Sequence, residues 1–563
     1  MMMRKKIAEM IREACETCKT KGIIPHEIDI EPIIETPREV EFGDYSTNIA
    51  FILAPKLRKN PFEIAEIIIS HLNYHDVCKK VEFAGKGFIN FFVKDELWRS
   101  SLLDIYRYGI DDFLPDIGKG KKVLIEFVSA NPTGPLHIGH GRGAVVGDVL
   151  ANILKSTGYK VVKEYYINDA GKQINTLGES TYLRWKELKG ESVDYPKDFY
   201  QGVYVKEFAA ELIEKNIPVS TERLEAVKQL AEYSGGKVMK GIQEDLEGFG
   251  VYFDNYFRES TLFEKGIVDE TLELLKSKGL AYEKDEALWF KTGLFENDED
   301  RVLVKSDGEK TYFASDIAYH RHKLERGFEL LIDLWGSDHH GYIPRLRASL
   351  DAIAGKKDRL KVILIQFVTL LKDGKPVGMS TRAGQFTTLK DVLGEVGKDA
   401  ARFFFLMRKS DAHLEFDLDL AKKTSNENPV FYVQYANARI ESIFRNAEED
   451  GIDTSIFIEN EKKRDANINV NLDILTSDEE ITLIKGIHQF YDVMEGCART
   501  FEPHRLTFYL IELVGRFHSY YNKTRVLKNE IDTTISRLFL LFMLQKIIQK
   551  GLYMLGVSAP ERM

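Results

Sequence analysis

The segment 121–144 constrains the fold of this chain more than any other stretch. Residues 123–128 form a short apolar run that favours a strand, Asn131–Pro135 interrupts it, and a glycine-rich apolar stretch begins at Leu136. This order predicts a strand, a turn and the start of a helix. In folds built from such units, ligands bind where the strands end. Functional side chains are therefore expected at this turn.

Two histidines, His137 and His140, fall on the first turn of the predicted helix. Free backbone N–H groups and the positive end of the helix dipole favour an anion there. Imidazoles three residues apart share a face and can donate hydrogen bonds to phosphate. Gly139, Gly141 and Gly143 have no side chain, so a bulky nucleotide can approach the backbone. The arrangement suits ATP.

The spacing of the two histidines leaves two other interpretations open. The pair can be a polar cap of the helix with no ligand. It can also belong to a metal site, although a metal needs further cysteine, histidine or acidic ligands and no cysteine lies nearby.

The string His137–His140 reads His-Ile-Gly-His and follows a strand and a Pro/Gly turn, so it resembles the HIGH signature of class I aminoacyl-tRNA synthetases. The longer string Glu126–Arg142 is similar to that of the arginyl-tRNA synthetases within this class. The resemblance implies that the substrates are ATP, L-arginine and tRNA(Arg). It also implies that His137, Gly139 and His140 bind ATP and that the two histidines are catalytic.

At 563 residues the chain is too long for a single core, and its patterns divide it into three domains. Residues 1–112 predict a small α+β domain, which by resemblance binds tRNA. Residues 113–425 alternate apolar strands with helices, which predicts a doubly wound parallel sheet of Rossmann type with a helical insertion at about 169–255. Residues 426–563 predict an all-α bundle, the anticodon-binding domain by resemblance. The expected strands of the parallel sheet are 123–128, 159–167, 328–334 and 361–371.

An arginine pocket needs carboxylates for charge and fixed acceptors for shape. Tyr312 and Asp316 would share one face of a helix start, and Glu126 lies on the strand before the HIGH-like turn. The residues alone also allow a helix cap and a packed tyrosine. By resemblance, Glu126, Tyr312 and Asp316 line the arginine pocket. Ser129 and Asn131 would hold the amino and carboxylate end of the substrate.

Asp338 and His339 follow the apolar run 328–334, so they emerge at another strand end. A metal site is disfavoured, because neighbouring residues do not easily converge on one ion. By resemblance this segment borders the adenylate, with Asp338 and His339 in contact with the nucleotide.

The second class I signature, Lys-Met-Ser-Lys-Ser, should follow the last strand of the sheet. Met379 and Ser380 match it, but Gly378 and Thr381 stand where the two lysines belong. Those lysines offset charge on the triphosphate as pyrophosphate leaves, which requires fixed cations. The departure leaves the phosphate clamp unidentified.

Other cations near this signature are candidates for the missing charge. Some arginyl enzymes carry a substitute lysine just before HIGH, but Gly134 occupies that place here. We expect Lys375, Arg382 or Mg²⁺ to supply it. Together with Ser380 these two cations complete the predicted catalytic set, while Met379 and Ser380 would contact ATP.

The formal net charge of −10 argues globally against a nucleic-acid partner, yet residues 501–528 hold five cations against two carboxylates. Segment 517–525 mixes aromatic and basic residues, which suits unstacked bases. Aromatics four apart on a helix can equally face the core, which is the alternative for Phe517 and Tyr521. The predicted tRNA contacts are Tyr435, Arg439, Phe517, Tyr521, Lys523 and Arg525.

The cysteines are too few and scattered for a disulfide framework, which fits a reducing cytosol. The pair Cys15 and Cys18 is a lone CxxC, more typical of packing than of zinc or redox chemistry. The apolar run 538–544 is far shorter than a membrane span. We expect a cytoplasmic monomer without zinc and without a membrane segment.

The leading hypothesis is an arginine–tRNA ligase. It would form arginyl-adenylate from arginine and ATP and then transfer arginine to tRNA, with activation itself dependent on bound tRNA as in the family. A cysteinyl-type synthetase is less suited, because its zinc site needs cysteines that are not placed for it here. The missing lysines motivate the alternative of a catalytically silent tRNA-binding paralogue.

Overall fold

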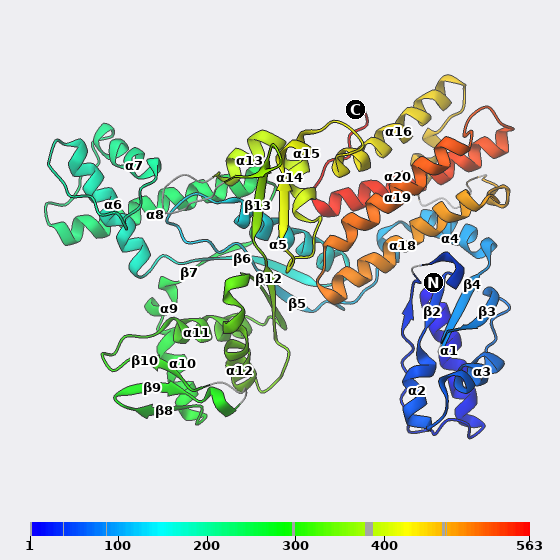
Figure 1. Cartoon of the computed structure of the whole chain (residues 1–563), viewed down its shortest axis with the longest axis horizontal. Helices are drawn as coiled ribbons and strands as arrows, with labels where there is room; N and C mark the ends of the chain where they lie inside the picture. Colours follow the sequence, from blue (N-terminus) through cyan, green and yellow to red (C-terminus); the bar gives the residue numbers. More distant parts are fainter. Residues whose placement is uncertain are drawn as a thin grey trace. The chain divides into compact units, whose positions relative to one another are not determined.

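The structure is a computed structural model that describes residues 3–37, 39–85, 87–294, 299–377, 387–463, 468 and 470–563. The chain divides into two compact units (Figure 1). The first comprises Met1–Leu114, Ile440–Tyr491 and Gly515–Ile547, and the second comprises Pro115–Arg439, Asp492–Val514 and Ile548–Met563.

The second unit contains a sheet of five parallel strands in the order β12-β11-β5-β6-β7. The chain enters at the middle strand β5, moves to β6 and β7, and then returns to the other side of β5 with β11 and β12. This is the doubly wound order, so the predicted α/β class is confirmed. The strand order reverses between β5 and β11, where a crevice for ligands is expected. The strands are β5 Lys122–Glu126, β6 Lys160–Ile167, β7 Asn255–Arg258, β11 Leu330–Gly336 and β12 Leu360–Ile365.

Helices connect these strands as the parallel arrangement requires (Figure 1). α5 follows β5, three helices lie between β6 and β7, α11 precedes β11, and α12 joins β11 to β12. The three helices between β6 and β7 pack on a small core that includes Tyr182, Leu212 and Leu230. The bounds are α5 Ile138–Ser156, α6 Lys172–Leu188, α7 Val203–Glu214, α8 Arg223–Gly248, α11 Tyr312–Glu325 and α12 Ile343–Ala354.

The predicted strand 361–371 is wrong as a single strand. The chain breaks after β12, and β13 then pairs with β14 and β15 instead of extending the parallel sheet. At the break, the Arg142 side chain and the carbonyl of Ser410 bind the backbone of Gln366, which fixes a bend that no sequence pattern marks. The bounds are β13 Val368–Lys372, β14 Lys375–Pro376, β15 Leu414–Asp417, α13 Leu389–Val396, α14 Lys398–Phe405 and α15 Leu418–Lys422.

Between β7 and α11 lies a small antiparallel sheet in the order β10-β9-β8, which the sequence patterns did not predict. Its apolar side joins a core with α10 and α11 that includes Leu272, Phe290, Leu303 and Phe313. The bounds are α9 Ser260–Glu264, α10 Ile267–Ser277, β8 Ala281–Lys284, β9 Ala287–Phe290, η3 Thr292–Leu294 and β10 Arg301–Val304.

The first unit includes a four-stranded antiparallel sheet in the order β1-β2-β4-β3, with helices around it. The polar segment 43–48 contains β2, and the apolar helix α2 begins after it. Cys15 and Cys18 are buried on α1, and burial raises the pKa of Cys15 to about 12, as for a packed thiol. The bounds are α1 Met3–Thr20, β1 Ile34–Glu35, η1 Val40–Phe42, β2 Tyr45–Thr47, α2 Ile49–Leu57, α3 Pro61–His71, β3 Cys78–Ala84, β4 Phe88–Val93, α4 Asp95–Tyr108 and η2 Asp111–Phe113.

From residue 426 onward the described residues form helices without strands, as predicted. α20 is long and apolar enough to cross a membrane by length and composition, but 78% of its apolar window is buried inside the structure. Its Phe539 packs on Tyr106 with ring centroids 5.1 Å apart, so α20 is a core helix. The bounds are α16 Pro429–Glu449, α17 Ser455–Lys463, η5 Leu472–Ile474, α18 Asp478–Thr500, α19 His504–Lys523 and α20 Ile531–Leu555.

Candidate active site at the carboxyl ends of the sheet

The HIGH-like turn, His137–His140, lies between β5 and α5. After β5, Val128 and Ser129 take positive φ values of 67° and 39°, which bends the chain out of the sheet. α5 begins at Ile138, so His137 is the N-cap residue and not part of the first turn as predicted. The turn is thus a sharp strand-to-helix corner.

The two histidines cap α5 reciprocally. The backbone N–H of Gly139 donates to His137 Nδ1 at 3.1 Å, and the backbone N–H of His137 donates to His140 Nδ1 at 3.3 Å. The polar-cap interpretation therefore describes their internal contacts. Because each Nδ1 accepts, each neutral ring carries its proton on Nε2, and these N–H groups are left to serve a ligand.

Both rings are neutral near pH 7. They stack with centroids 3.7 Å apart. Burial, together with the neighbouring His137, lowers the pKa of His140 to about 3, and burial also lowers the pKa of His137. The histidines can donate hydrogen bonds to a triphosphate, but they add no positive charge to it.

The HIGH-like turn also contacts the segment before α13. The N–H of Leu389 donates to the carbonyl of Leu136 at 2.8 Å, and His137 forms a β-bridge with Thr388. A Cβ at Gly141 would lie 2.6 Å from the Leu389 side chain. Gly141 therefore serves this close packing and not the approach of a nucleotide.

The predicted signature loop falls largely outside the described residues. Met379, Ser380 and Arg382, with Gly378 and Thr381, belong to the undescribed segment 378–386. Lys375 is described. It is exposed on β14, in a tight hairpin where it pairs with Lys372.

Glu126, at the end of β5, belongs to a buried ionic group that we call the balanced cluster: Glu126, Asp333, Lys323 and His320. Lys323 is fully buried, and its Nζ lies 2.5 Å from Glu126 Oε2 and 3.0 Å from Asp333 Oδ1. The other Glu126 oxygen accepts from Ser129 Oγ at 3.0 Å. The charge of Glu126 is therefore already compensated within the protein.

His320 completes the balanced cluster. Its Nε2 lies 2.6 Å from Asp333 Oδ2, and its Nδ1 lies 2.7 Å from the carbonyl of Asp316. Each ring nitrogen therefore faces an oxygen atom. The two carboxylates of this cluster thus meet the Lys323 ammonium and the His320 imidazole.

Asp316 and Glu259 form a second pair of carboxylates, which we call the open pair. Asp316, on α11, accepts from the Tyr342 hydroxyl at 2.6 Å. Glu259 follows β7 and is hydrogen-bonded to Tyr166. Burial and the charge of Asp316 raise its pKa to about 7. Within the described part of the chain, no Lys or Arg nitrogen lies within 4 Å of either carboxylate.

The open pair has the chemistry that a guanidinium needs, namely negative charge without an internal partner. Sequence reasoning found Asp316 but missed Glu259, Lys323, Tyr166 and Tyr342. Glu259 follows β7, a strand of only four residues that leaves no clear periodicity. The signal that could have found Glu259 is a charged residue directly after a parallel strand.

Tyr312 and Asn131 lie at the edge of this region. Tyr312 begins α11 after the N-cap Thr311 and is 67% exposed, so the alternative of a packed tyrosine is wrong. Its hydroxyl lies 3.7 Å from where a Cβ at Gly171 would be. Asn131 donates to Gln173 at 2.7 Å. Both therefore meet the loop that starts α6.

A cavity of about 510 Å³ adjoins this loop. It lies between the ends of β6 and β7 and the helices α6 and α8. Its lining includes Pro132, Ile167, Asp169, Gly171, Arg258 and Ser260. The cavity connects the insertion to the carboxyl edge of the sheet.

Asp338 and His339 lie in η4 (Ser337–Tyr342), directly after β11. Both side chains are exposed, and His339 Nε2 is 3.6 Å from Asp338 Oδ2. β11 and β5 are neighbours in the sheet, so this segment and the HIGH-like turn emerge at the same edge.

The predicted tRNA contacts fall in different environments. On α16, the Arg439 guanidinium lies over the Tyr435 ring and donates to its hydroxyl at 3.1 Å. On α19, Tyr521 and Lys523 are exposed, as is Arg525 just beyond this helix. The prediction that Phe517 contacts tRNA is wrong. Its side chain is fully buried, because an aromatic on the inner face of α19 packs in the core and offers no surface to a base.

Comparison with known proteins agrees with these features. The family described as tRNA synthetases class I (R), catalytic domain, matches residues 111–428. The arginyl tRNA synthetase N terminal domain matches residues 2–93, and the DALR anticodon binding domain matches residues 433–563. The chain belongs to the arginyl-tRNA synthetase family.

Members of the arginyl-tRNA synthetase family resemble the chain over its full length. The arginine–tRNA ligase of Citrifermentans bemidjiense is 48% identical over 100% of both chains. A solved structure from Campylobacter jejuni, described as an arginyl-tRNA synthetase, is 34% identical to this chain and has a TM-score of 0.74. The match covers 84% of this chain and 100% of that chain. The Thermus thermophilus arginyl-tRNA synthetase shares the fold, with a TM-score of 0.77 at 21% identity over 100% of both chains.

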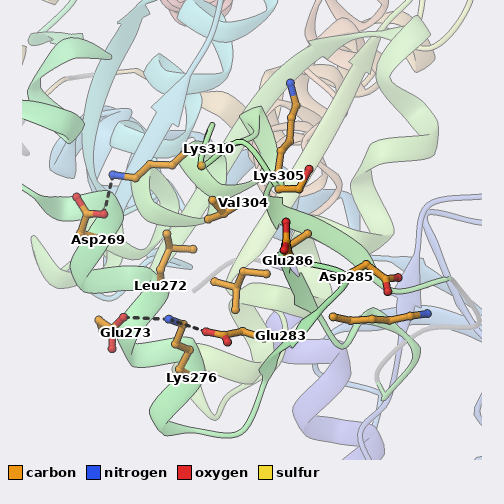
Figure 2. Close-up of a pocket in the computed structure, with 15 residues that line it drawn as sticks. Asp269, Leu272, Glu273, Lys276, Glu283, Asp285, Glu286, Val304, Lys305 and Lys310 are labelled. Carbon is orange, nitrogen blue, oxygen red and sulfur yellow. Dashed lines mark hydrogen bonds and ion pairs between the residues drawn. The ribbon is translucent and has the colours of Figure 1, made fainter.

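Another cavity, of about 780 Å³, lies between α10, the β8–β9 hairpin and β10 (Figure 2). None of the described residues that were predicted for the arginyl-tRNA synthetase site lines it. Two of its lysines are paired with carboxylates of the lining: Lys310 with Asp269 at 2.6 Å, and Lys276 with Glu273 at 3.3 Å.

Proposed function

We propose that the second unit activates L-arginine with ATP at the carboxyl edge of its parallel sheet and transfers it to tRNA(Arg). The chain is an arginine–tRNA ligase of class I, as its family and its full-length relatives are. The open pair, Asp316 and Glu259, carries the assignment of the substrate. Buried carboxylates without an internal cation fit a guanidinium, and they stand at the same edge as the HIGH turn.

The reaction has two steps. A carboxylate oxygen of arginine attacks the α-phosphorus of ATP, the bond to the bridging oxygen of pyrophosphate breaks, and arginyl-adenylate forms. The terminal ribose hydroxyl of the tRNA then attacks the carbonyl carbon of the adenylate, AMP leaves, and the hydroxyl proton passes to solvent. Protein groups position the reactants and stabilise charge, so no covalent nucleophile is needed.

Three groups of residues share this work in the proposal. The Nε2–H groups of His137 and His140 donate to the triphosphate, and Asp338 and His339 lie beside the nucleotide. The open pair, Glu126 and Tyr312 line the pocket for the arginine side chain. Ser129 and Asn131 hold the amino and carboxylate end of the substrate.

The missing signature lysines leave the triphosphate charge to other groups. Lys375 and Arg382 are the candidates from the chain, with Met379 and Ser380 against the nucleotide. Mg²⁺ usually binds through ATP phosphates and one or two carboxylates, and it would offset triphosphate charge. The exposed carboxylate of Asp338 at the end of β11 fits such a role.

The tRNA would contact both ends of the chain. We assign residues 1–112 to a tRNA-binding domain, 113–425 to the catalytic domain and 426–563 to the anticodon-binding domain. Tyr435, Arg439, Tyr521, Lys523 and Arg525 are the proposed contacts, because aromatic and basic side chains suit unstacked bases. The four cysteines are free and buried, which fits a monomer in a reducing cytoplasm.

ATP–pyrophosphate exchange with L-arginine, run with and without tRNA(Arg), tests the function. We expect exchange that requires arginine and increases with the tRNA. Citrulline, the neutral isostere, should be rejected by roughly 10⁴-fold, because it leaves the open pair without a cation. No exchange under any condition, with tRNA still bound, would favour the silent paralogue.

The Glu259→Gln variant tests the site. We expect the KM for arginine to rise, while the KM for ATP stays unchanged. Glu273→Gln is the matched control, since this carboxylate lies on α10 at the cavity of Figure 2 and not at the strand ends. Equal KM values for arginine in both variants would contradict the proposed pocket.

A further inference from the structure

A buried ionic contact at Asp148 holds α5, the helix that carries the HIGH turn. Asp148 lies on α5, about 12 Å beyond His140 at 1.5 Å of rise per residue. Its Oδ1 lies 3.0 Å from Lys163 Nζ on β6, and its Oδ2 lies 2.6 Å from Arg402 Nη2 on α14. Arg402 is fully buried. The contact therefore links α5 to a guanidinium that has no access to solvent.

The remaining donors of Arg402 bind two helix ends. Its Nε donates to the carbonyl of Leu555 at 2.7 Å, and its Nη1 donates to the carbonyl of Phe249 at 3.2 Å. Leu555 is the last residue of α20, and Phe249 is the C-cap of α8. Carbonyls at these ends have no partner within their helix and carry the negative end of its dipole, so a guanidinium suits both.

From α14, one side chain thus contacts three other helices: α5 with the HIGH turn, α8 of the insertion and the C-terminal end of α20. Two further features hold the end of α20 in this place. Asn152 on α5 donates to the carbonyl of Met554 at 3.1 Å. Gly556 has a φ of 67°, and a Cβ there would lie 2.5 Å from the Arg402 guanidinium. The backbone after α20 passes directly against Arg402.

Charge compensation alone does not account for Arg402. Lys163 already neutralises Asp148, and a lysine is a single point donor. Only a planar fork reaches a carboxylate and two carbonyls in different directions. The geometry therefore indicates that this residue holds helices in position.

We propose that Arg402 is a positioning residue for arginine activation. By fixing α5 against the ends of α20 and α8, it holds His137 and His140 where ATP needs them. This inference rests on the proposed function, because it takes the HIGH turn as the ATP site. The arginine pocket is built on β5, β7 and α11, so a loosened α5 should slow the reaction of bound ATP and leave arginine binding intact.

The experiment compares Arg402→Lys and Arg402→Met with the unmodified enzyme in arginine- and tRNA-dependent ATP–pyrophosphate exchange, with rates divided by the titrated number of active sites. We expect kcat per active site to fall on the order of 10- to 100-fold in both, as when a distant change misplaces a catalytic group. The KM for arginine should not change. Lysine should not rescue the rate, because it keeps the charge but loses the fork.

Gly556→Ala perturbs the same junction from the α20 side and keeps Arg402. The added methyl group must displace the guanidinium, so the same fall in kcat at unchanged KM for arginine is expected. Thr507→Val is the matched control. Its hydroxyl lies 2.6 Å from the carbonyl of His504 on α19 and 3.0 Å from the carbonyl of Leu406 at the end of α14, so it does not reach α5. This variant should lower the melting temperature but keep kcat.

The outcomes separate cleanly. Wild-type kcat per active site in Arg402→Lys, or variants that lose only melting temperature and active fraction, would show a purely structural residue and overturn the inference alone. Absence of exchange in the unmodified enzyme would overturn the proposed function, and this inference with it.

Discussion

The balanced cluster and the open pair are both groups of buried carboxylates in one catalytic unit, but they differ in their counter-charges. In the balanced cluster, Glu126 and Asp333 meet the fully buried Lys323 and the ring of His320. In the open pair, Asp316 and Glu259 meet tyrosine hydroxyls, and the pKa of Glu259 rises to about 7. Burial raises the pKa of Glu126 as well, but the neighbouring Lys323 opposes this shift, and no Lys or Arg nitrogen of the described residues lies within 4 Å of the open pair.

The contrast distinguishes carboxylates that stabilise the fold from carboxylates that bind a ligand. A buried carboxylate is costly unless it is paired, so the balanced cluster supplies its own cations and can stabilise the strand ends before any substrate arrives. The open pair lacks them, so a bound guanidinium would supply the missing charge. Buried carboxylates without a cation of the protein beside them are therefore typical of a binding site.

The largest effect should come from breaking the balanced cluster. Lys323→Met would leave Glu126 and Asp333 buried without their ammonium partner, and we expect a loss of about 3–5 kcal/mol in the free energy of unfolding. Urea denaturation measures this loss. The exposed pair Lys305 and Glu309 offers a control, since Lys305→Met should change the free energy of unfolding much less than Lys323→Met. Equal losses in both variants would remove the contrast.

The next effect concerns the open pair. Asp316→Asn would remove half of the charge that faces the guanidinium, and we expect kcat/KM for arginine to fall about 10²- to 10³-fold, as for one partner of a buried ion pair. Unlike Lys323→Met, this variant should keep or gain stability, because it removes an uncompensated buried charge. A stability loss with unchanged kcat/KM would place Asp316 in the structural class.

A smaller effect should follow from the hydroxyl that orients Asp316. Tyr342→Phe removes the 2.6 Å hydrogen bond to Asp316 Oδ2. Hydrogen bonds to charged groups contribute about 1.5–3 kcal/mol, so kcat/KM for arginine should fall at least about tenfold. Steady-state exchange kinetics decide this. Tyr282→Phe, whose hydroxyl binds Asp300 in the small sheet, serves as the control.

The contrast between the two groups also marks how far the sequence could predict the site. The strand–turn–helix around His137, the doubly wound class and the helical C-terminal region followed from apolar periodicity and from Pro/Gly breaks. These are local signals, so they survive in a single sequence. Asp316 and Glu126 were found through resemblance to the family.

Long-range pairing explains what was missed. Lys323 neutralises Glu126 across a wide separation in the chain, and nothing local to either residue indicates it. Glu259 became visible only once β7 joined the edge of the sheet. The predicted strand 361–371 failed for the same reason, because a distant arginine, Arg142, fixes the break at Gln366. Phe517 depended on which face of α19 is buried.

The pH dependence of arginine binding is the mildest test of the open pair. Burial and Asp316 raise the pKa of Glu259 to about 7, so the free enzyme holds a proton there below that pH. A guanidinium favours the ionised form, so binding must release this proton. The KM for arginine should therefore rise about tenfold per pH unit below 7 and level off above it.

We do not expect the histidines of the HIGH turn to contribute to the pH dependence of the KM for arginine. Burial lowers the pKa of His140 to about 3 and also lowers the pKa of His137, so both shifts lead away from the pKa of Glu259. Glu259→Gln should raise the KM for arginine at all pH values and remove its slope between pH 6 and 8. A slope that persists in this variant would assign the titration to another group and leave Glu259 without its role, since the guanidinium of arginine itself stays charged throughout.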